Sequence, residues 1–199
     1  MTKRLTADRR VCGFLLILLL MGSSCHRKQK NIEKTLSQMI GKEVIFPNTL
    51  QAKVYGKDTV YDQLNRSCFK IITYADSTGC TDCRLNFYGW RLRMEEVKTW
   101  NQPVEFVFIL QPKNDSDLYF LLRSNQFSHA VWYDYPNDFM RLNELPEGPL
   151  YQTFLVDSQN TILLVGNPIG NKKMWDLYQK AMDMLPATQP VEDLTQVSP

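Results

Sequence analysis

The sequence of 199 residues predicts an α/β domain built on a mixed central sheet. Apolar runs rich in β-branched residues alternate with stretches of helical periodicity, and together they occupy 69–75, 80–100, 104–110, 117–127 and 130–134. This alternation predicts parallel strands joined by crossover helices. Two more strand-like runs, 151–157 and 161–166, are separated by a short turn, which predicts an antiparallel hairpin.

The first 25 residues have the pattern of a secretion signal. Four basic residues at positions 3, 4, 9 and 10 precede an apolar run over 11–21, and small residues follow at 22–24. That run is shorter than the roughly 20 apolar residues that a bilayer-spanning helix needs. We therefore expect this segment to be cleaved rather than to span the membrane.

The junction "LMGSSC" resembles a bacterial lipobox, in which the cysteine is lipidated and becomes the new N-terminus. This resemblance implies lipidation of Cys25, although Gly22 stands where leucine is usual. His26 follows in place of the aspartate that favours inner-membrane retention, which implies attachment to the outer membrane, facing the periplasm of a Gram-negative bacterium. An ordinary soluble signal or an uncleaved anchor is the alternative.

Removal of the signal changes the charge balance of the chain. The full sequence holds 23 basic and 21 acidic residues, of which four basic and one acidic precede Cys25, so 19 basic and 20 acidic residues remain. The mature net charge is then about −1, and no basic patch interleaved with aromatic residues stands out. The composition gives no support for a nucleic-acid partner.

The remaining elements follow from their local patterns. The periodicities predict a spacer over 26–30, a helix over 31–40, short strands over 43–47 and 51–56, a last helix over 172–185 and a disordered tail over 187–199. The domains expected from this division are a signal at 1–25, an N-terminal extension at 26–59, a main domain at 60–186 and the tail.

The cysteines divide into separate roles. Cys12 leaves with the signal and Cys25 takes lipid, so the body keeps Cys68, Cys80 and Cys83. An exported protein meets an oxidising compartment, in which a close pair of cysteines forms a disulfide unless it is kept reduced. Cys68 opens an apolar run and is expected to be a small buried residue. Cys80 and Cys83 could form a redox couple, half of a metal site or a structural bridge.

The order of elements resembles the thioredoxin fold, in which a CxxC motif follows the first parallel strand and opens a helix. The pair "CTDC" lies at that place, and "QTFLVDSQNTILLVGNPIG" (152–170) resembles the closing hairpin of that family. The resemblance covers roughly 60–186. It implies a thioredoxin-like, three-layer α/β/α architecture with a central mixed sheet and an N-terminal β extension, similar to membrane-anchored thiol-disulfide oxidoreductases.

The resemblance implies catalytic roles for the two cysteines. Cys80, at the first turn of a helix, would be the nucleophilic thiolate, because orphan N–H groups and the helix dipole stabilise an anion there. Cys83, one turn later, would be the resolving thiol. Cys83 would also start an apolar stripe along the helix, which continues through Phe87, Trp90, Met94 and Val97.

The sequence also departs from the thioredoxin family. Gly79 stands where tryptophan usually precedes the motif, Thr81 and Asp82 separate the cysteines without a proline, and no buried acid is evident in the preceding strand. Tyr151 falls at the position of the family's cis-proline. A non-proline cis bond costs about 2.5 to 4 kcal/mol, so we expect a trans bond at Tyr151 and an altered substrate edge.

Two alternatives to thiol-disulfide exchange are kept. A copper-handling protein would use Cys80 and Cys83 with His129 as a third ligand. A redox-inert binding module would keep the cysteine pair as a permanent disulfide. A zinc site lacks a second CxxC, and the sequence shows no Ser-His-Asp, paired-carboxylate or phosphate-loop pattern; the aspartates at 115, 117, 134 and 138 are interpreted as caps and loop acids.

The expected partners follow from this chemistry. Thiol-disulfide exchange implies protein thiols or disulfides as substrates, a membrane-linked electron donor, and no organic cofactor or metal. The membrane itself would be contacted through the lipid on Cys25. A docking rim for a partner protein is expected at Trp132, Tyr133 and Tyr151, with burial of these aromatics in the core as the alternative.

Overall fold

The computed structural model describes residues 29–76 and 85–185. The chain divides into two compact units, Met1–Gln38 and Met39–Pro199. In the first unit the described residues form the N-terminal helix, which the sequence pattern predicts, and which runs over 29–39. The second unit contains every strand described below.

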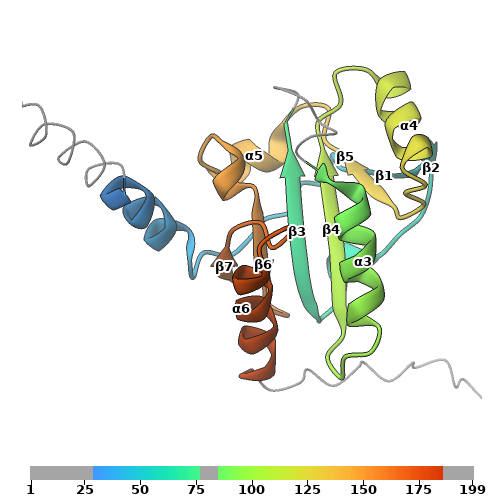
Figure 1. Ribbon diagram of the computed structural model, residues 1–199. Helices are drawn as coiled ribbons and strands as arrows, with labels where there is room; N and C mark the ends of the chain where they lie inside the picture. The colour runs from blue at the N-terminus through green and yellow to red at the C-terminus, as the bar shows by residue number, and fades with distance from the viewer. Residues whose placement is uncertain (1–28, 77–84, 186–199) are drawn as a thin grey trace, which may run out of the picture. The chain divides into compact units, whose positions relative to one another are not determined.

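A seven-stranded mixed sheet forms the centre of the second unit (Figure 1). Its strand order is β2-β1-β5-β4-β3-β6-β7, with β3 parallel to β4, β4 parallel to β5, and the remaining neighbours antiparallel. The strands are β1 (Gln51–Val54), β2 (Lys57–Asp58), β3 (Phe69–Ala75), β4 (Val104–Leu110), β5 (Val131–Tyr133), β6 (Thr153–Val156) and β7 (Ile162–Val165).

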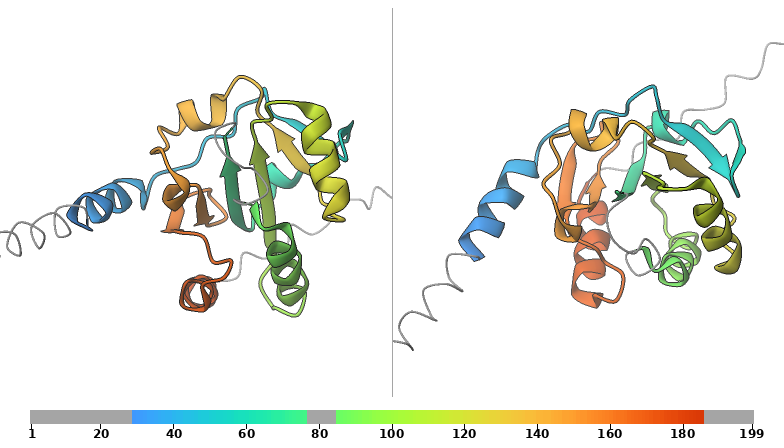
Figure 2. Two further views of the ribbon diagram at one scale, coloured as in Figure 1. Left: turned by 45° about the horizontal axis from the view of Figure 1, so that its top comes forward. Right: turned by 90° about the horizontal axis from the view of Figure 1, so that it is seen from above.

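Helices cover both faces of this sheet, giving three layers (Figure 2). Three helices pack on one face, and α5 lies on the other. The helical segments are η1 (Gln63–Asn65), α3 (Phe87–Val97), α4 (Asp115–Ser124), α5 (Asp138–Leu142), η2 (Pro149–Tyr151) and α6 (Lys172–Asp183), of which α3, α4 and α6 share a face. Because both faces are covered, β3 is buried along its whole length, as its continuous apolar run predicts.

The main core lies between the sheet and the α3, α4 and α6 layer. Trp90 is fully buried there, with its ring 6.0 Å from that of Phe106 and 5.6 Å from that of Phe108 in edge-on contacts. Trp175 and Tyr178 of α6 complete this core. Burial of such aromatic side chains supplies about 2 to 3 kcal/mol each, which makes this face the main source of stability.

The opposite face is closed by fewer side chains. Phe139 of α5 packs between Tyr74 and Phe46, with ring centroids 5.8 Å and 5.9 Å away. Asp134 is fully buried and accepts hydrogen bonds from the backbone N–H groups of Asp138 and Phe139, at 2.9 and 3.0 Å. It therefore caps α5, as the interpretation of this aspartate as a capping acid predicts.

Two predicted elements are wrong. Residues 43–47 do not form a strand, since only Glu43 makes an isolated bridge with Thr161. The helix predicted over 80–100 is interrupted at Asn86, which adopts a left-handed conformation with φ of 40° and caps α3. The spacing of apolar residues does not predict this break, because Asn86 is not one of the buried residues. It ends the helix through its left-handed backbone conformation and its side-chain oxygen, which caps α3.

Candidate active site

The predicted site residues Cys80 and Cys83 belong to residues 77–84 and lie outside the described part of the chain, as does the predicted lipidation site Cys25. The two ends of that segment are described. Asp76 follows directly after β3, and Leu85 is buried in the main core. The CxxC motif is therefore attached to the carboxyl end of the strand that lies between β4 and β6. In α/β sheets, sites commonly form where parallel strands end.

Leu85 is helical, Asn86 interrupts the helix, and α3, which carries the described part of the predicted apolar stripe, begins at Phe87. Phe87, Trp90 and Val97 are buried and Met94 packs against the same core, which confirms the described part of the stripe. The side chain of Asn86 accepts a hydrogen bond from the Gly89 N–H at 3.0 Å. The N–H groups and positive dipole end of α3 therefore lie at Phe87, while the predicted place of Cys80 at the first turn of a helix falls outside the described residues.

Polar groups surround the carboxyl end of β3, and we call Thr73, Asp76, Tyr151 and Gln152 the strand-end region. Gln152 is buried; its side chain donates to the Asp76 carboxylate at 3.1 Å, and its carbonyl accepts from the Tyr74 N–H at 2.8 Å. These two bonds tie the end of β3 and Asp76 to the residue that precedes β6. Sequence reasoning missed Gln152, although a polar residue beside the position of the cis-proline was an available signal.

Thr73 adds an unusual feature to the strand-end region. It is buried, pairs with Thr153 across β3 and β6, and its hydroxyl has no hydrogen-bond partner among the described residues. An unsatisfied buried hydroxyl costs about 1 to 3 kcal/mol, so such groups are rare and are concentrated at strained or functional places. Thr73 was also missed, because a single threonine in an apolar run is ordinary strand composition.

Tyr151 occupies the end of the short 3-10 helix η2, directly before Gln152 and β6. No cis peptide bond occurs among the described residues, which confirms the trans bond expected at this position. The edge that faces extended substrates in the thioredoxin family is therefore built differently here.

The expected docking rim is wrong for two of its three residues. Tyr133 is fully buried and Trp132 is 8% exposed, because both side chains belong to β5 in the middle of the sheet. Burial raises the pKa of the Tyr133 hydroxyl to about 12, with a smaller contribution from Asp115. Only Tyr151 keeps a half-exposed surface at the carboxyl ends of the strands.

The opposite end of β3 carries a second polar group, and we call Gln63, Arg66, Lys70, Glu105 and His129 the strand-start cluster. Gln63 is fully buried and donates to the Phe106 carbonyl at 2.6 Å and to Glu105 at 2.9 Å, while Glu105 also pairs with Arg66.

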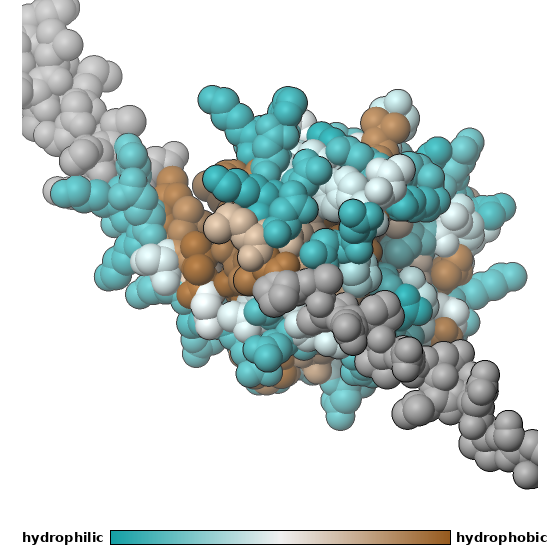
Figure 3. Space-filling view, turned by 90° about the horizontal axis from the view of Figure 1, so that it is seen from below, coloured by the Kyte–Doolittle hydropathy of each residue, from teal (hydrophilic) through white to brown (hydrophobic). Residues whose placement is uncertain are grey.

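The Lys70 ammonium donates to the Arg66 carbonyl at 2.6 Å and to Asn160 at 2.9 Å. Burial lowers the pKa of Lys70, and the nearby Glu105 and Asp157 carboxylates partly offset this. Figure 3 shows the molecule from this end, where hydrophilic side chains make up much of the visible surface.

Cys68 directly precedes β3 at this end and is 5% exposed, which confirms the prediction of a small buried residue. Burial raises the pKa of its thiol, while the nearby Lys70 charge partly opposes the increase. A thiol that is buried and hard to ionise is a poor nucleophile. Cys68 therefore has a structural role.

His129 belongs to the same end and not to the strand-end region. Its Nε2 lies 2.7 Å from the Phe106 carbonyl oxygen, and because a carbonyl only accepts, Nε2 carries the proton. Phe106 is paired with Ile71, four residues before the end of β3, or about 13 Å at roughly 3.3 Å per residue. Burial lowers the pKa of His129, although the Phe106 carbonyl and Glu105 oppose it. This position does not favour His129 as a third copper ligand.

Two absences hold for the described ranges, 29–76 and 85–185. Within them, no group of three or more His, Cys, Asp or Glu side chains is arranged to hold a metal ion. No helix in these ranges is both long and apolar enough to cross a membrane.

No protein-family model matches the sequence, and no curated protein matches it significantly. Solved structures do match the fold. The thioredoxin domain of a thiol-disulfide oxidoreductase from Bacteroides vulgatus superposes with a TM-score of 0.53 at 10% identity, covering 72% of this chain and 97% of its own. A Chlorobium tepidum protein described as a thiol:disulfide interchange protein of the DsbE type gives 0.54 at 16% identity, covering 72% and 98%. A conserved Geobacillus kaustophilus protein gives 0.55 at 9% identity, covering 75% and 85%.

The chain therefore has the thioredoxin-like fold, as its element order predicts. The β extension is also confirmed, since β1 and β2 extend the sheet on the side of β5. At this level of identity, the likeness concerns the fold.

Proposed function

We propose that this protein carries out thiol-disulfide exchange, with Cys80 as the nucleophile and Cys83 as the resolving cysteine. One observation carries the proposal: in a thioredoxin-like fold, the CxxC motif follows the end of β3 after four intervening residues, and the neighbours of β3 are β4 and β6. The names of two similar structures, which describe thiol-disulfide oxidoreductase or interchange proteins, support the same chemistry.

The exchange needs no organic cofactor. The Cys80 thiolate attacks one sulfur of a substrate disulfide, forming a mixed disulfide and releasing the other substrate sulfur as a thiolate that takes up a proton. The Cys83 thiolate then attacks Cys80, which frees the second substrate thiol and leaves a Cys80–Cys83 disulfide. Two electrons pass from the protein to the substrate, and a dithiol donor must reduce the pair again. The strand-end region holds the chain that carries these thiols.

The proposed location follows from the signal and the lipobox. The mature protein would be anchored through lipid on Cys25 to the outer membrane and would face the periplasm of a Gram-negative bacterium. Metabolic labelling with a clickable palmitate analogue should modify the wild-type protein and not Cys25→Ala. Equal labelling of both proteins, or none of either, would remove lipidation from the proposal.

A redox-inert binding module is the second candidate, and the placement of Tyr151 favours it. Thioredoxins bind extended chains beside a cis-proline, and here Tyr151, at the end of η2, stands at that position with a trans bond. General disulfide reduction is therefore not implied by the fold alone.

Trapping separates the two candidates. In Cys83→Ser, a redox enzyme should accumulate mixed disulfides on Cys80, visible as protein adducts on non-reducing gels that reductant removes. The matched control is Cys80→Ser with Cys83 intact, and Cys68→Ala should leave trapping unchanged. Absence of adducts, together with a Cys80–Cys83 disulfide that never turns over a small disulfide substrate, would establish the inert module.

A further inference from the structure

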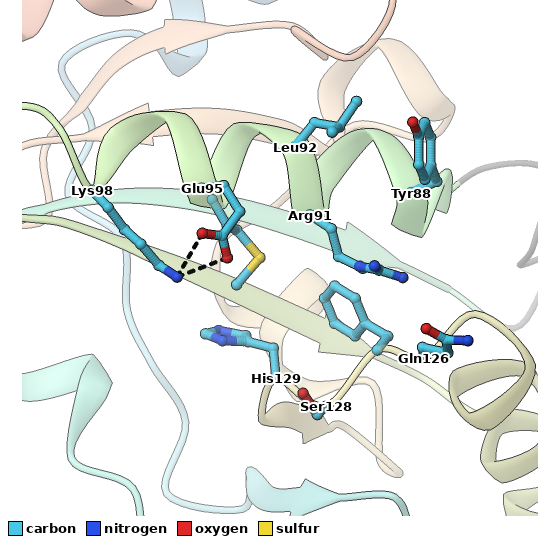
Figure 4. Close-up of a pocket in the computed structure, with 10 residues that line it drawn as sticks. Tyr88, Arg91, Leu92, Glu95, Lys98, Gln126, Ser128 and His129 are labelled. Atoms are coloured by element: carbon cyan, nitrogen blue, oxygen red, sulfur yellow. Dashed lines mark hydrogen bonds and ion pairs between the residues drawn. The ribbon is translucent and has the colours of Figure 1, made fainter.

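A groove of about 600 Å³ runs along α3 and faces the loop before β5 (Figure 4). One wall is formed by the exposed side of α3, including Tyr88, Arg91 and Leu92, and the other by residues 126–129. The groove begins at Tyr88, five residues after Cys83, and continues to the last turn of the helix. Its volume falls within the range of ligand sites.

A buried aromatic cluster lies beneath this groove. Phe127 is 1% exposed, and its ring centroid lies 4.5 Å from that of Phe87 and 5.0 Å from that of Phe108. At the rim, Tyr88 and Leu92 are 64% and 54% exposed. The exposed apolar surface of Tyr88 and Leu92 suits a ligand that carries an aliphatic or aromatic side chain.

Arg91 gives the groove an unpaired positive charge. Its guanidinium donates to the Asn125 carbonyl at 3.1 Å, and it has no ion pair within the described ranges. The other charged residues of the groove are Glu95 and Lys98, which neutralise each other at 2.7 Å. Figure 4 shows this pair beside Arg91, with His129 and Ser128 on the facing loop. The remaining guanidinium donors suit a carboxylate.

His129 gives the groove an acceptor. Because its Nε2 proton is donated to the Phe106 carbonyl, its Nδ1 atom is a bare acceptor, and Nδ1 has no partner among the described residues. Gln63 approaches only Nε2, at 3.4 Å. Burial keeps the ring neutral by lowering its pKa, so Nδ1 can accept a hydrogen bond from an N–H group.

We propose that this groove binds an extended segment of the substrate protein, in which an acidic residue contacts Arg91 and a neighbouring apolar side chain packs against Tyr88 and Leu92. A backbone N–H of the segment would donate to Nδ1 of His129. This inference rests on the proposed thiol-disulfide exchange and names its class of substrate. The substrate would be a protein disulfide in which an acidic and apolar stretch precedes or follows the cysteine.

The test measures binding without redox chemistry. The Cys80→Ser/Cys83→Ser protein is titrated into a fluorescein-labelled decapeptide that contains Asp-Leu-Phe among serines and glycines, and into a matched peptide with Lys in place of Asp. We expect saturable binding of the acidic peptide, at least tenfold weaker binding of the lysine peptide, and amide NMR shifts at 88–95 and 126–129.

A charge reversal tests the groove itself. Arg91→Glu should weaken binding of the acidic peptide at least tenfold, while Lys173→Glu, which makes the same charge change at an exposed position of α6, should alter it less than twofold. No saturable binding, equal effects of both reversals, or NMR shifts confined to other regions would overturn the groove. Turnover of a small disulfide by the wild-type protein is measured separately, and its absence would overturn only the exchange reaction.

Discussion

The two ends of β3 both bring cysteine chemistry to one strand, but they treat polar groups in opposite ways. At the start, the buried Gln63 and Lys70 have hydrogen-bond partners at 2.6 to 2.9 Å, and Cys68 is sealed beside them. Near the end, the buried Thr73 hydroxyl has no partner among the described residues, and the chain leaves the sheet at Asp76 toward Cys80.

The difference shows that the two ends of one strand can have unlike surroundings: Cys68, at the start, is buried beside polar groups that all have partners. Buried polar groups that all have hydrogen-bond partners favour one conformation. A buried polar group without a partner destabilises the folded state, and such groups are rare in native proteins. The strand-start cluster therefore stabilises the fold, whereas the Thr73 hydroxyl, like three other buried polar atoms of the described residues, lowers its stability.

The largest difference between the ends should appear in thiol reactivity. When the reduced native protein is treated with iodoacetamide, Cys68 should be modified at least about 100-fold more slowly than Cys80, because a buried thiol reacts only after local opening. Mass spectrometry of the digested peptides measures both rates. In guanidinium the rates should converge, and fast native labelling of Cys68 would break the comparison.

A substitution in the strand-start cluster should cost the most stability. Gln63→Leu removes the donors to Glu105 and Phe106 and the acceptor for Trp132, and should lower the free energy of unfolding by about 2 kcal/mol. Urea unfolding followed by tryptophan fluorescence measures this change. The control Gln159→Leu, at an exposed turn position, should stay within about 0.5 kcal/mol. A similar loss in both would show that the buried network contributes nothing specific.

In the strand-end region, a substitution that removes a buried polar group should increase the free energy of unfolding instead of lowering it. Thr73→Val replaces an unsatisfied buried hydroxyl with a methyl group and should raise the free energy of unfolding by about 1 kcal/mol. Thr73→Ser keeps the hydroxyl, loses the methyl group and should be destabilising. The same urea experiment applies, and a destabilised Thr73→Val would mean that the hydroxyl is satisfied in solution.

The smallest effect concerns pH. Burial places the pKa of His129 below its ordinary value of 6.5 in the folded protein, so on acidification the unfolded chain takes up this proton first. The contribution of His129 to stability is complete above pH 6.5 and is lost as the pH falls toward the folded pKa. His129→Gln should therefore show a shallower fall in melting temperature between pH 7.5 and 5 than the wild-type protein. Parallel curves would place the pKa of His129 at its ordinary value.

Local composition was sufficient for most of the fold. The runs at 69–75 and 104–110 coincide with β3 and β4, because strands that are covered on both faces need an unbroken apolar sequence. Polar caps such as Asn114 and Asn171 mark the starts of α4 and α6 and accept hydrogen bonds from Ser116 and Met174. These signals depend only on residues close together in the chain, so they can be recognised in the sequence.

The candidate site was predictable only in part. The CxxC motif and its place after β3 could be read directly, whereas the break at Asn86 could not, since it depends on one left-handed residue. Gly89 shows the same limit: a side chain there would approach within 2.5 Å of Ile169, a contact between residues 80 positions apart. Close approaches of this kind exist only once distant segments have been brought together.

By itself, the sequence determined the alternation of strands and helices, the spacing of the cysteines and the buried character of Cys68, because each depends on hydrophobic pattern over a few residues. Only the tertiary structure decided that His129 lies toward the start of the strands, that Trp132 and Tyr133 are core residues, and that Arg91 faces a groove. Those facts depend on strand order and register, which join residues through space without leaving a local pattern in the chain.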